Sequence, residues 1–295
     1  MSGTVVSEDY PFDSKFVEVH GSKMHYIESG SGTPILFLHG VPTFSYLWRN
    51  IIPHLSTLGR CIAPDLIGFG KSDKPDLDYS LQDHIKYINR FIEKLDLKNI
   101  ILVLHGFGSI PGFSYAMHHE NNCKGIVFYE SFLRPIEDES FSLPFQEQMH
   151  LLNNNEVNIA EVSTDFVDKV MPQCVGRQLT NRELEFYRGP FLQPGSNKPL
   201  LSYLHELPNV SHQTNELISQ YSSWLKESKL QKLMLFSIPG FYTTISTVMW
   251  AKQYLDNLEI IEIGESLHFA QETNPDFMGE SISIWLQGIE QSDNF

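Results

Sequence analysis

Short runs of apolar residues alternate with amphipathic stretches along most of the chain. Pro34–Leu38 and Ile100–Leu104 are almost continuously apolar, which is typical of strands buried on both faces. Leu81–Leu95 instead repeats its apolar side chains at helical spacing. This alternation predicts a mostly parallel sheet covered by helices. The expected strands are Lys23–Glu28, Pro34–Leu38, Arg60–Pro64, Ile100–Leu104, Gly125–Tyr129, Lys232–Ser237 and Glu259–Ile263.

The segment from Phe132 to about Trp224 interrupts this rhythm. It is polar, contains Asn153–Asn155 and the pair Pro194–Gly195, and has helical patterning without strong strands. We therefore expect a helical cap over residues 132–225, inserted between the two parts of one α/β core, residues 1–131 and 226–295. Ligands of open α/β sheets bind beyond the carboxyl ends of the strands. A cap inserted there would shape a pocket.

Composition excludes several classes of partner. The formal net charge of the 295 residues is −15, and no basic block offsets it, which argues against a nucleic-acid partner. No apolar run reaches the ~18 residues of a membrane span. The first residues, MSGTVVSEDYPF, lack the basic and apolar regions of a secretory signal. The three cysteines are scattered, which fits a reducing compartment. We expect a cytoplasmic protein without nucleic-acid or membrane partners.

Three residues near predicted strand ends carry the candidate chemistry. Gly106 lies in His105–Gly108, a strand–turn–helix junction of the kind that presents a nucleophile in many hydrolases. Glu130 ends an apolar run and needs a partner if it is buried. His268 follows the last predicted strand, the best position for a catalytic base among the twelve histidines. Each feature alone is common, but the three together and in this order are far more specific than any one of them.

A fourth feature is the loop His39–Pro42, which follows a predicted strand. A loop of this kind often supplies a backbone N–H to a developing anion. Alternatively, the loop is a turn that requires only Gly40. The sequence leaves both interpretations open.

The chain resembles the haloalkane dehalogenases, and with them the related coelenterazine luciferases, of the α/β-hydrolase fold. The resemblance spans nearly the whole chain. It is densest in FLHGVPTFSYLWRNIIPHL (37–55), RCIAPDLIGFGKSDKPDLDY (60–79), FYESFLRP (128–135), YRGPFLQP (187–194) and LHFAQETNPDFMG (267–279). It implies an α/β-hydrolase fold, with a mostly parallel central sheet, flanking helices and a helical cap insertion.

The resemblance also implies roles for individual residues. The family displaces halide with an aspartate at the elbow, and a histidine oriented by an acid then activates the water that hydrolyses the ester. His268 falls on the base, and Glu130 falls on the acid of one subgroup. The nucleophile position is Gly106. The family's halide-binding asparagine and tryptophan correspond to Val41 and Phe107.

These three departures change the expected chemistry. Gly106 cannot form the covalent ester. Val41 and Phe107 have no side-chain N–H donors, each of which is typically worth ~3 kcal/mol in a transition state. Conventional halide displacement is therefore not expected. An engineered knock-out would explain Gly106 alone, whereas the joint change is typical of natural divergence.

Three functions remain open from the sequence. The first is non-covalent general-base chemistry on a small hydrophobic molecule through the His268–Glu130 dyad. The second is a catalytically inactive protein that binds such a molecule. The third uses Ser109 as a substitute nucleophile, although its position in the first helical turn favours a helix-capping role. Whether the chain is an enzyme is left open at this point.

The expected pocket is apolar, and no cofactor or metal ion is expected in it. Some of its residues fall on segments that line the site in the family, although ordinary core packing is the commoner fate of such side chains. The candidate lining residues are Val41, Phe107, Phe132, Phe141, Phe145, Phe241 and Leu267.

Overall fold

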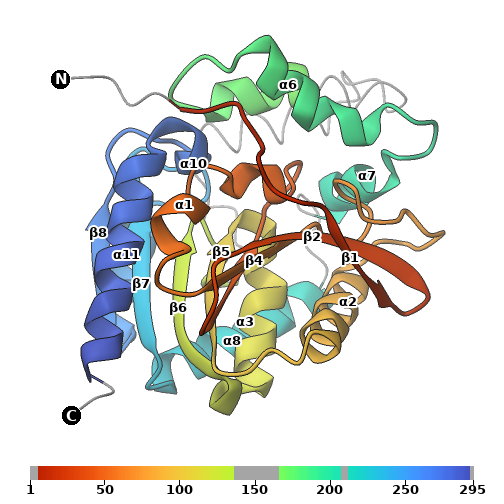
Figure 1. The fold of residues 1–295 in the computed structure, drawn as a ribbon. Coiled ribbons are helices and arrows are strands. Elements are labelled where there is room, and N and C mark those ends of the chain that lie inside the picture. Colours follow the sequence, from red (N-terminus) through yellow and green to blue (C-terminus); the bar gives the residue numbers. More distant parts are fainter. Residues whose placement is uncertain (1–5, 136–165, 207–211, 293–295) are drawn as a thin grey trace.

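The computed structural model describes residues 6–135, 166–206 and 212–292 (Figure 1). Its centre is an eight-stranded sheet with the order β1-β2-β4-β3-β5-β6-β7-β8. The strands are β1 (Lys15–Val19), β2 (Ser22–Ser29), β3 (Pro34–Leu38), β4 (Arg60–Pro64), β5 (Ile100–His105), β6 (Cys123–Tyr129), β7 (Gln231–Phe236) and β8 (Leu258–Glu262). β2 pairs antiparallel with β1 and β4, and all other pairs are parallel.

The expected strands are all confirmed, and each observed end lies within two residues of the expected one. β1 was not predicted from the sequence. Four of its five residues are exposed or only partly buried because it lies at the sheet edge, so no continuous apolar run marks it.

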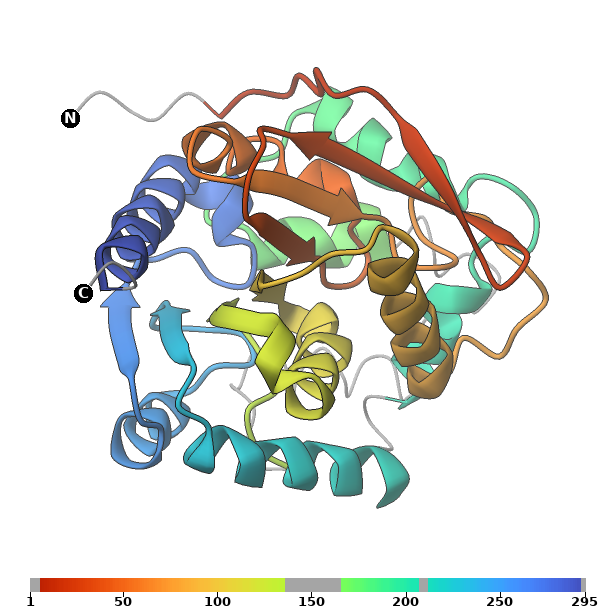
Figure 2. The ribbon, with the colours of Figure 1, turned by 60° about the horizontal axis from the view of Figure 1, so that its bottom comes forward.

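Helices cover both faces of the sheet. The α-helices of the described residues are α1 (Ile52–Leu55), α2 (Leu81–Lys94), α3 (Ser109–His118), α6 (Asn181–Arg188), α7 (Lys198–Glu206), α8 (His212–Glu227), α9 (Ile245–Tyr254), α10 (Ala270–Thr273) and α11 (Pro275–Ser292). Figures 1 and 2 show α1 and α11 on one face and α2, α3 and α8 on the other. The expected helix at 81–95 is confirmed as α2, which Ser80 and Asp83 cap reciprocally. The expected fold class is therefore confirmed.

The cap region is represented by α6 and α7, which lie over one end of the sheet (Figure 1). α8 instead packs along α3, beside the sheet (Figure 2). The expected division into 1–131, 132–225 and 226–295 stays a prediction, and the position of α8 favours a cap that ends before residue 212.

The two buried central strands β5 and β6 position the residues of the candidate site. Every residue of β5 is buried, and β6 is buried from Gly125 to Tyr129. β5 and β6 pair in register up to His105 and Tyr129. Gly106 and Glu130, which directly follow these two strands, therefore lie side by side at the carboxyl end of the sheet. Among the described residues, no helix has the length and apolar character needed to cross a bilayer.

Candidate functional site

Gly106 occupies a turn whose backbone conformation disfavours other residues. β5 ends at His105, a 3₁₀ turn covers Gly106–Gly108, and α3 begins at Ser109. The φ angle of Gly106 is +52°, in the left-handed region. A Cβ atom placed on Gly106 would lie 3.3 Å from Gly40 Cα and 3.4 Å from His268 Nε2. A side chain at position 106 would therefore start next to the imidazole of His268.

His268 and Glu130 form a buried hydrogen-bonded pair. His268 Nδ1 donates to Glu130 Oε2 at 3.0 Å, and the side chains are 3% and 0% exposed. The backbone N–H groups of Phe241, Tyr242 and Thr243 also donate to this carboxylate, at 2.9, 2.7 and 3.0 Å. The structure thus supplies the partner that a buried Glu130 requires.

Burial shifts the proton affinities of both members of this pair. It raises the pKa of Glu130 to about 7, although the three backbone N–H donors oppose the shift. Burial lowers the pKa of His268 to about 3. Above pH 7 the pair therefore consists of a carboxylate and a neutral imidazole. Because Nδ1–H donates to the carboxylate, Nε2 is unprotonated and faces Gly106.

Backbone contacts fix the loop that carries His268. The N–H groups of His268 and Phe269 both donate to the carbonyl of Cys174, at 3.1 and 3.2 Å. His105 Nε2 donates to the His268 carbonyl at 2.9 Å. The sequence analysis did not identify Cys174 or His105 as positioning residues. The only sequence signal for His105 is its place directly before Gly106.

Val41 and Phe107 lie buried and apolar, 3% and 6% exposed. The ring of Phe107 packs edge-on against Tyr203 and His84, with centroid distances of 5.3 and 5.1 Å. Neither Val41 nor Phe107 carries a side-chain hydrogen-bond donor. An anion at these positions would therefore find no side-chain N–H.

Aromatic rings surround His268. The centroids of Phe241, Tyr242 and Phe269 lie 5.4, 4.6 and 4.5 Å from the imidazole centroid. Phe132 packs on Tyr242 at 4.8 Å, and Leu267 directly precedes His268. The roles of Phe132, Phe241 and Leu267 as pocket residues stay predictions. Phe141 and Phe145 lie outside the described residues.

Two phenol groups in this region escaped the sequence analysis. The hydroxyls of Tyr203 and Tyr242 are 2.5 Å apart, and both side chains are buried. Tyr242 directly follows Phe241, a predicted pocket residue, and this adjacency was the one feature of the sequence that could have indicated Tyr242. Tyr203 belongs to α7 and has no sequence signal of its own. The surroundings of His268 are therefore aromatic but not purely apolar.

Ser109 does not reach the imidazole. Its hydroxyl donates to the Gly106 carbonyl at 2.6 Å and accepts the N–H of Phe132 at 3.1 Å. Both bonds hold the backbone of the turn against the loop after β6. This geometry disfavours Ser109 as a substitute nucleophile.

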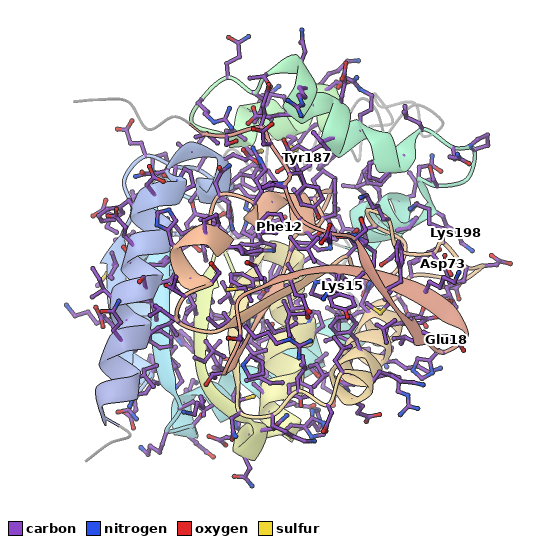
Figure 3. The ribbon with its side chains drawn as sticks, viewed as in Figure 1. Phe12, Lys15, Glu18, Asp73, Tyr187 and Lys198 are labelled. Carbon is purple, nitrogen blue, oxygen red and sulfur yellow. The ribbon has the colours of Figure 1, made fainter. Side chains whose placement is uncertain are left out.

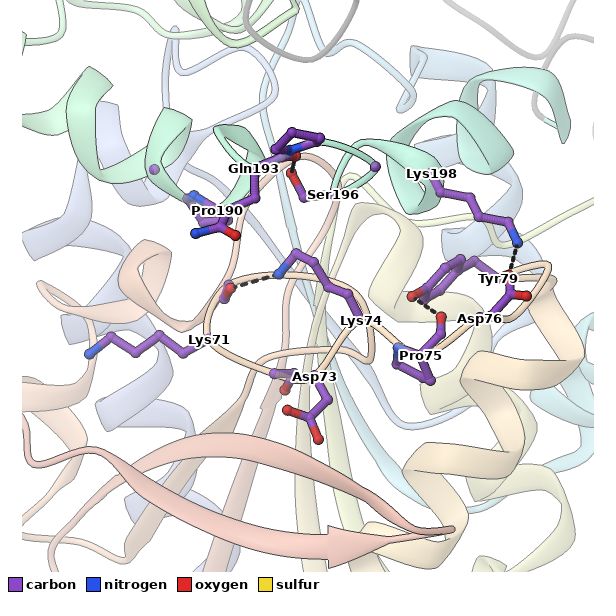
Figure 4. Close-up of a pocket in the computed structure, with 15 residues that line it drawn as sticks. Lys71, Asp73, Lys74, Pro75, Asp76, Tyr79, Pro190, Gln193, Ser196 and Lys198 are labelled. Carbon is purple, nitrogen blue, oxygen red and sulfur yellow. Dashed lines mark hydrogen bonds and ion pairs between the residues drawn. The ribbon is translucent and has the colours of Figure 1, made fainter.

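An open cleft of about 890 Å³ lies between residues 70–79 and 189–198 (Figure 4). None of its lining residues is one of the predicted site residues. The described part of the chain brings together no three His, Cys, Asp or Glu side chains arranged to hold a metal ion.

The chain is similar to known proteins over nearly its whole length. The family model for the α/β-hydrolase fold matches residues 33–271. A haloalkane dehalogenase of Sphingobium indicum is 36% identical over 289 residues, 95% of this chain and 97% of the relative. One of Agrobacterium fabrum is 34% identical over 278 residues, 92% and 91% of the two chains.

Solved structures give the same result. The crystal structure of the haloalkane dehalogenase DatA from Agrobacterium tumefaciens has a TM-score of 0.88 at 34% identity and covers 94% of this chain and 97% of that chain. The haloalkane dehalogenase DbeA from Bradyrhizobium elkani has a TM-score of 0.90 at 32% identity, with 95% and 99% covered.

Proposed function

The chain belongs to the haloalkane dehalogenase family of the α/β-hydrolase fold, and from this premise we propose that it acts on a small hydrophobic molecule by non-covalent general-base chemistry through His268 and Glu130. One observation carries the proposal. The unprotonated Nε2 of His268 faces position 106, where glycine offers no side chain. We infer that a substrate or a water molecule takes the place of that side chain next to the base.

The covalent route of the family is not part of this proposal. Gly106 has no carboxylate to attack a carbon–halogen bond. Val41 and Phe107 supply no side-chain donor for a leaving halide, and both side chains are buried at their positions. The relatives bear the name haloalkane dehalogenase, but this chain differs at the three positions that the resemblance assigns to that chemistry.

In the proposed reaction, His268 Nε2 removes a proton from the bound molecule. The imidazolium that forms keeps its Nδ1–H bond to Glu130, whose negative charge stabilises it. Three backbone N–H groups hold the carboxylate in place, so the histidine needs little reorganisation during proton transfer. Phe241 and Phe269 favour a hydrophobic substrate next to the base.

A second candidate is a binding protein without catalysis. The residues at 41, 106 and 107 favour it, because they remove covalent chemistry and leave an apolar surface. The intact pair of His268 and Glu130 favours the first candidate. For either candidate we propose a cytoplasmic location, which is supported by three buried cysteines outside any disulfide, Cys61, Cys123 and Cys174.

Proton abstraction from 5-nitrobenzisoxazole tests the two candidates. This molecule is small and hydrophobic, and its ring opens to a coloured phenolate when a base removes one proton. The native chain should exceed the buffer rate by ~10²–10⁴-fold, the usual contribution of a positioned base. His268→Ala should abolish that excess, whereas His212→Ala, at an exposed histidine on α8, should leave it unchanged.

Equal turnover by His268→Ala would contradict the general-base proposal. No turnover by the native chain would contradict it too. If such a chain also retains a hydrophobic ligand in native mass spectrometry, the binding protein becomes the better description.

A further inference from the structure

A second histidine–carboxylate pair belongs to β2 and the residue after β4, toward one edge of the sheet. His268 follows β8, the strand at the opposite edge. His25 of β2 places Nδ1 2.8 Å from Asp65 Oδ2, directly after β4. Its other nitrogen, Nε2, lies 3.0 Å from the hydroxyl oxygen of Ser14, the residue before β1. The Lys71 ammonium lies 2.8 Å from the same oxygen. Four side chains thus form one continuous hydrogen-bonded chain in the order Asp65, His25, Ser14 and Lys71.

The direction of each hydrogen bond follows from the chemistry of the groups. The Asp65 carboxylate accepts the backbone N–H groups of Ser45 and Lys71, at 2.8 and 2.7 Å. Burial opposes its ionisation, but hydrogen bonds from His25 and Ser45 hold its pKa below the usual value. An ionised Asp65 only accepts, so His25 Nδ1 carries the proton that donates to it, and the ring can act as a base only through Nε2.

The hydrogen bonds of Ser14 allow it to donate its proton to His25. The four side chains are called the relay below. Lys71 can only donate, so the Ser14 oxygen accepts from Lys71 and its proton is free to point at His25 Nε2. The side chains of His25 and Asp65 are 0% exposed, whereas Ser14 is exposed. Figure 3 labels Lys15, the residue that follows Ser14 in the sequence. The buried part of the relay therefore delivers its effect to a solvent-accessible hydroxyl.

We propose that Ser14 is the nucleophile of a second hydrolytic site on this chain, activated by His25, Asp65 and Lys71, and that the site cleaves activated aryl esters. This activity is independent of the function proposed for His268. The arrangement has the roles of a serine–histidine–aspartate triad, which are defined by geometry and not by sequence position. The Lys71 ammonium lies at the Ser14 oxygen, where it favours loss of the hydroxyl proton by stabilising the partial negative charge on the attacking atom.

The reaction balances without any co-reactant other than water. The Ser14 oxygen forms a bond to the acyl carbon while its proton passes to His25 Nε2. The bond between the acyl carbon and the aryl oxygen breaks, and the aryloxide takes that proton. Water then attacks the Ser14 ester, His25 relays a proton back to Ser14, and a carboxylic acid leaves.

The surroundings favour an aryl group. Phe16 is 51% exposed and packs edge-on against His25, with centroids 5.2 Å apart. It offers an exposed apolar surface directly beside the relay. Lys71 and Ser72 also border the open cleft at residues 70–79, and Figure 4 shows Lys71 extending away from Lys74 and Lys198. Access to the Ser14 hydroxyl does not depend on this cleft, because Ser14 itself is exposed.

Labelling with a fluorophosphonate, which phosphonylates activated serines, tests the proposal on the full chain. Intact mass should show one adduct, and peptide mapping should place it on Ser14. Ser14→Ala should lose the adduct and the release of p-nitrophenol from p-nitrophenyl acetate. Because Ser14 is exposed, this variant leaves the core untouched. Lys71→Met should slow labelling by about tenfold, the order of one lost charged hydrogen bond.

A control variant shows whether the adduct depends on this site alone. Ser7→Ala removes another serine of the same N-terminal segment and should label like the native chain. Labelling and proton abstraction from 5-nitrobenzisoxazole are measured on the same variants, so that failure of either site is distinguishable from failure of the other. The absence of an adduct, or an adduct that persists in Ser14→Ala, would overturn the proposal and leave Ser14 as a structural hydrogen-bond partner of His25.

Discussion

The Nε2 atom of His268 lies 3.4 Å from the position that a Cβ atom would take on Gly106. The turn therefore has the strand–turn–helix geometry predicted for a nucleophile elbow, and glycine supplies no side chain at position 106. Its φ angle of +52° strains any residue other than glycine, although asparagine and aspartate adopt it more often than most.

This relationship makes the covalent reaction recoverable. Gly106→Asp combined with Val41→Asn and Phe107→Trp should release bromide from a bromoalkane, because it supplies the carboxylate and both halide donors. The new Cβ meets Gly40 Cα at 3.3 Å, so neighbours must shift by a few tenths of an ångström. We expect the left-handed backbone to cost about 1–2 kcal/mol of folding free energy. Bromide release and intact mass of the alkyl ester measure the outcome.

The control for this experiment is Gly106→Ala with the same two partner substitutions. It carries the same backbone strain but no carboxylate, so it should release no bromide. Absence of both ester and bromide in a folded aspartate variant would show that other parts of the site have also diverged.

A buried ion network joins the core, the cap region and the histidine loop. The Arg49 guanidinium contacts Glu272 at 2.5 and 2.8 Å and Glu183 of α6 at 2.8 Å, and all three side chains are 0% exposed. Tyr187, labelled in Figure 3, donates its hydroxyl to Glu272 as well. Glu272 lies four residues after His268.

Arg49→Met should therefore destabilise the fold strongly. Removing one partner leaves two buried carboxylates with less compensation, which typically costs about 3–5 kcal/mol. Urea unfolding measures the difference. The matched control is Arg90→Met, which breaks the exposed pair with Glu93 and should change the free energy of unfolding by less than about 1 kcal/mol. Similar values for the two variants would show that the network contributes little.

The sequence predicted the sheet well because buried parallel strands carry their own signal. Pro34–Leu38 and Arg60–Pro64 have the expected ends, whereas β1 carries no such signal because it is an edge strand with exposed side chains. Strand ends also pointed to Gly106, Glu130 and His268. Each of the three follows a parallel strand, β5, β6 or β8, and the carboxyl ends of parallel strands lie at the same end of the sheet.

Contacts between distant segments could not be predicted in the same way. The carbonyl of Cys174 fixes His268 across more than ninety residues, and Tyr203 meets Tyr242 through α7. The relay from Ser14 to Asp65 joins three segments whose pairing depends on the antiparallel register of β2. No local pattern records which carbonyl or hydroxyl a folded loop brings near.

Lys232 provides a test at alkaline pH. Its side chain is 0% exposed, and its ammonium donates to the carbonyls of Ser228, Leu230 and Asp256 at 2.8, 2.9 and 3.0 Å. Burial lowers its pKa from 10.5 to about 8. Between pH 8 and 10.5 the unfolded chain binds more protons than the folded one, so folding becomes more favourable as the pH rises.

The native chain should therefore gain stability relative to Lys232→Met between pH 8 and 10, by no more than about 1.4 kcal/mol per pH unit. At pH 7 the variant should be the less stable protein, because three carbonyls lose their donor. Unfolding in urea at pH 7 and pH 9.5 gives both values. A difference that does not change with pH would contradict the lowered pKa of Lys232.

The pH dependence of proton abstraction tests the pairing of Glu130 with His268. Burial raises the pKa of Glu130 from 4.5 to about 7 and lowers that of His268 to about 3. As the pH falls through 7, Glu130 takes up a proton and can no longer stabilise the imidazolium. The rate on 5-nitrobenzisoxazole should therefore be constant above pH 8 and fall below pH 7, while the imidazole itself is still neutral.

Glu130→Gln distinguishes titration of the carboxyl from titration of the histidine. The variant should react slowly and show no change in rate between pH 5 and 8, because the titrating carboxyl is absent. A rate that still falls below pH 7 in Glu130→Gln would assign the limb to His268 instead. The free energy of unfolding tests the raised pKa of Glu130 independently. That raised pKa stabilises the fold below pH 4.5, and the contribution is lost as the pH rises through 7. Relative to Glu130→Gln, the native chain should thus lose stability between pH 4.5 and 7, which urea unfolding at the two pH values measures.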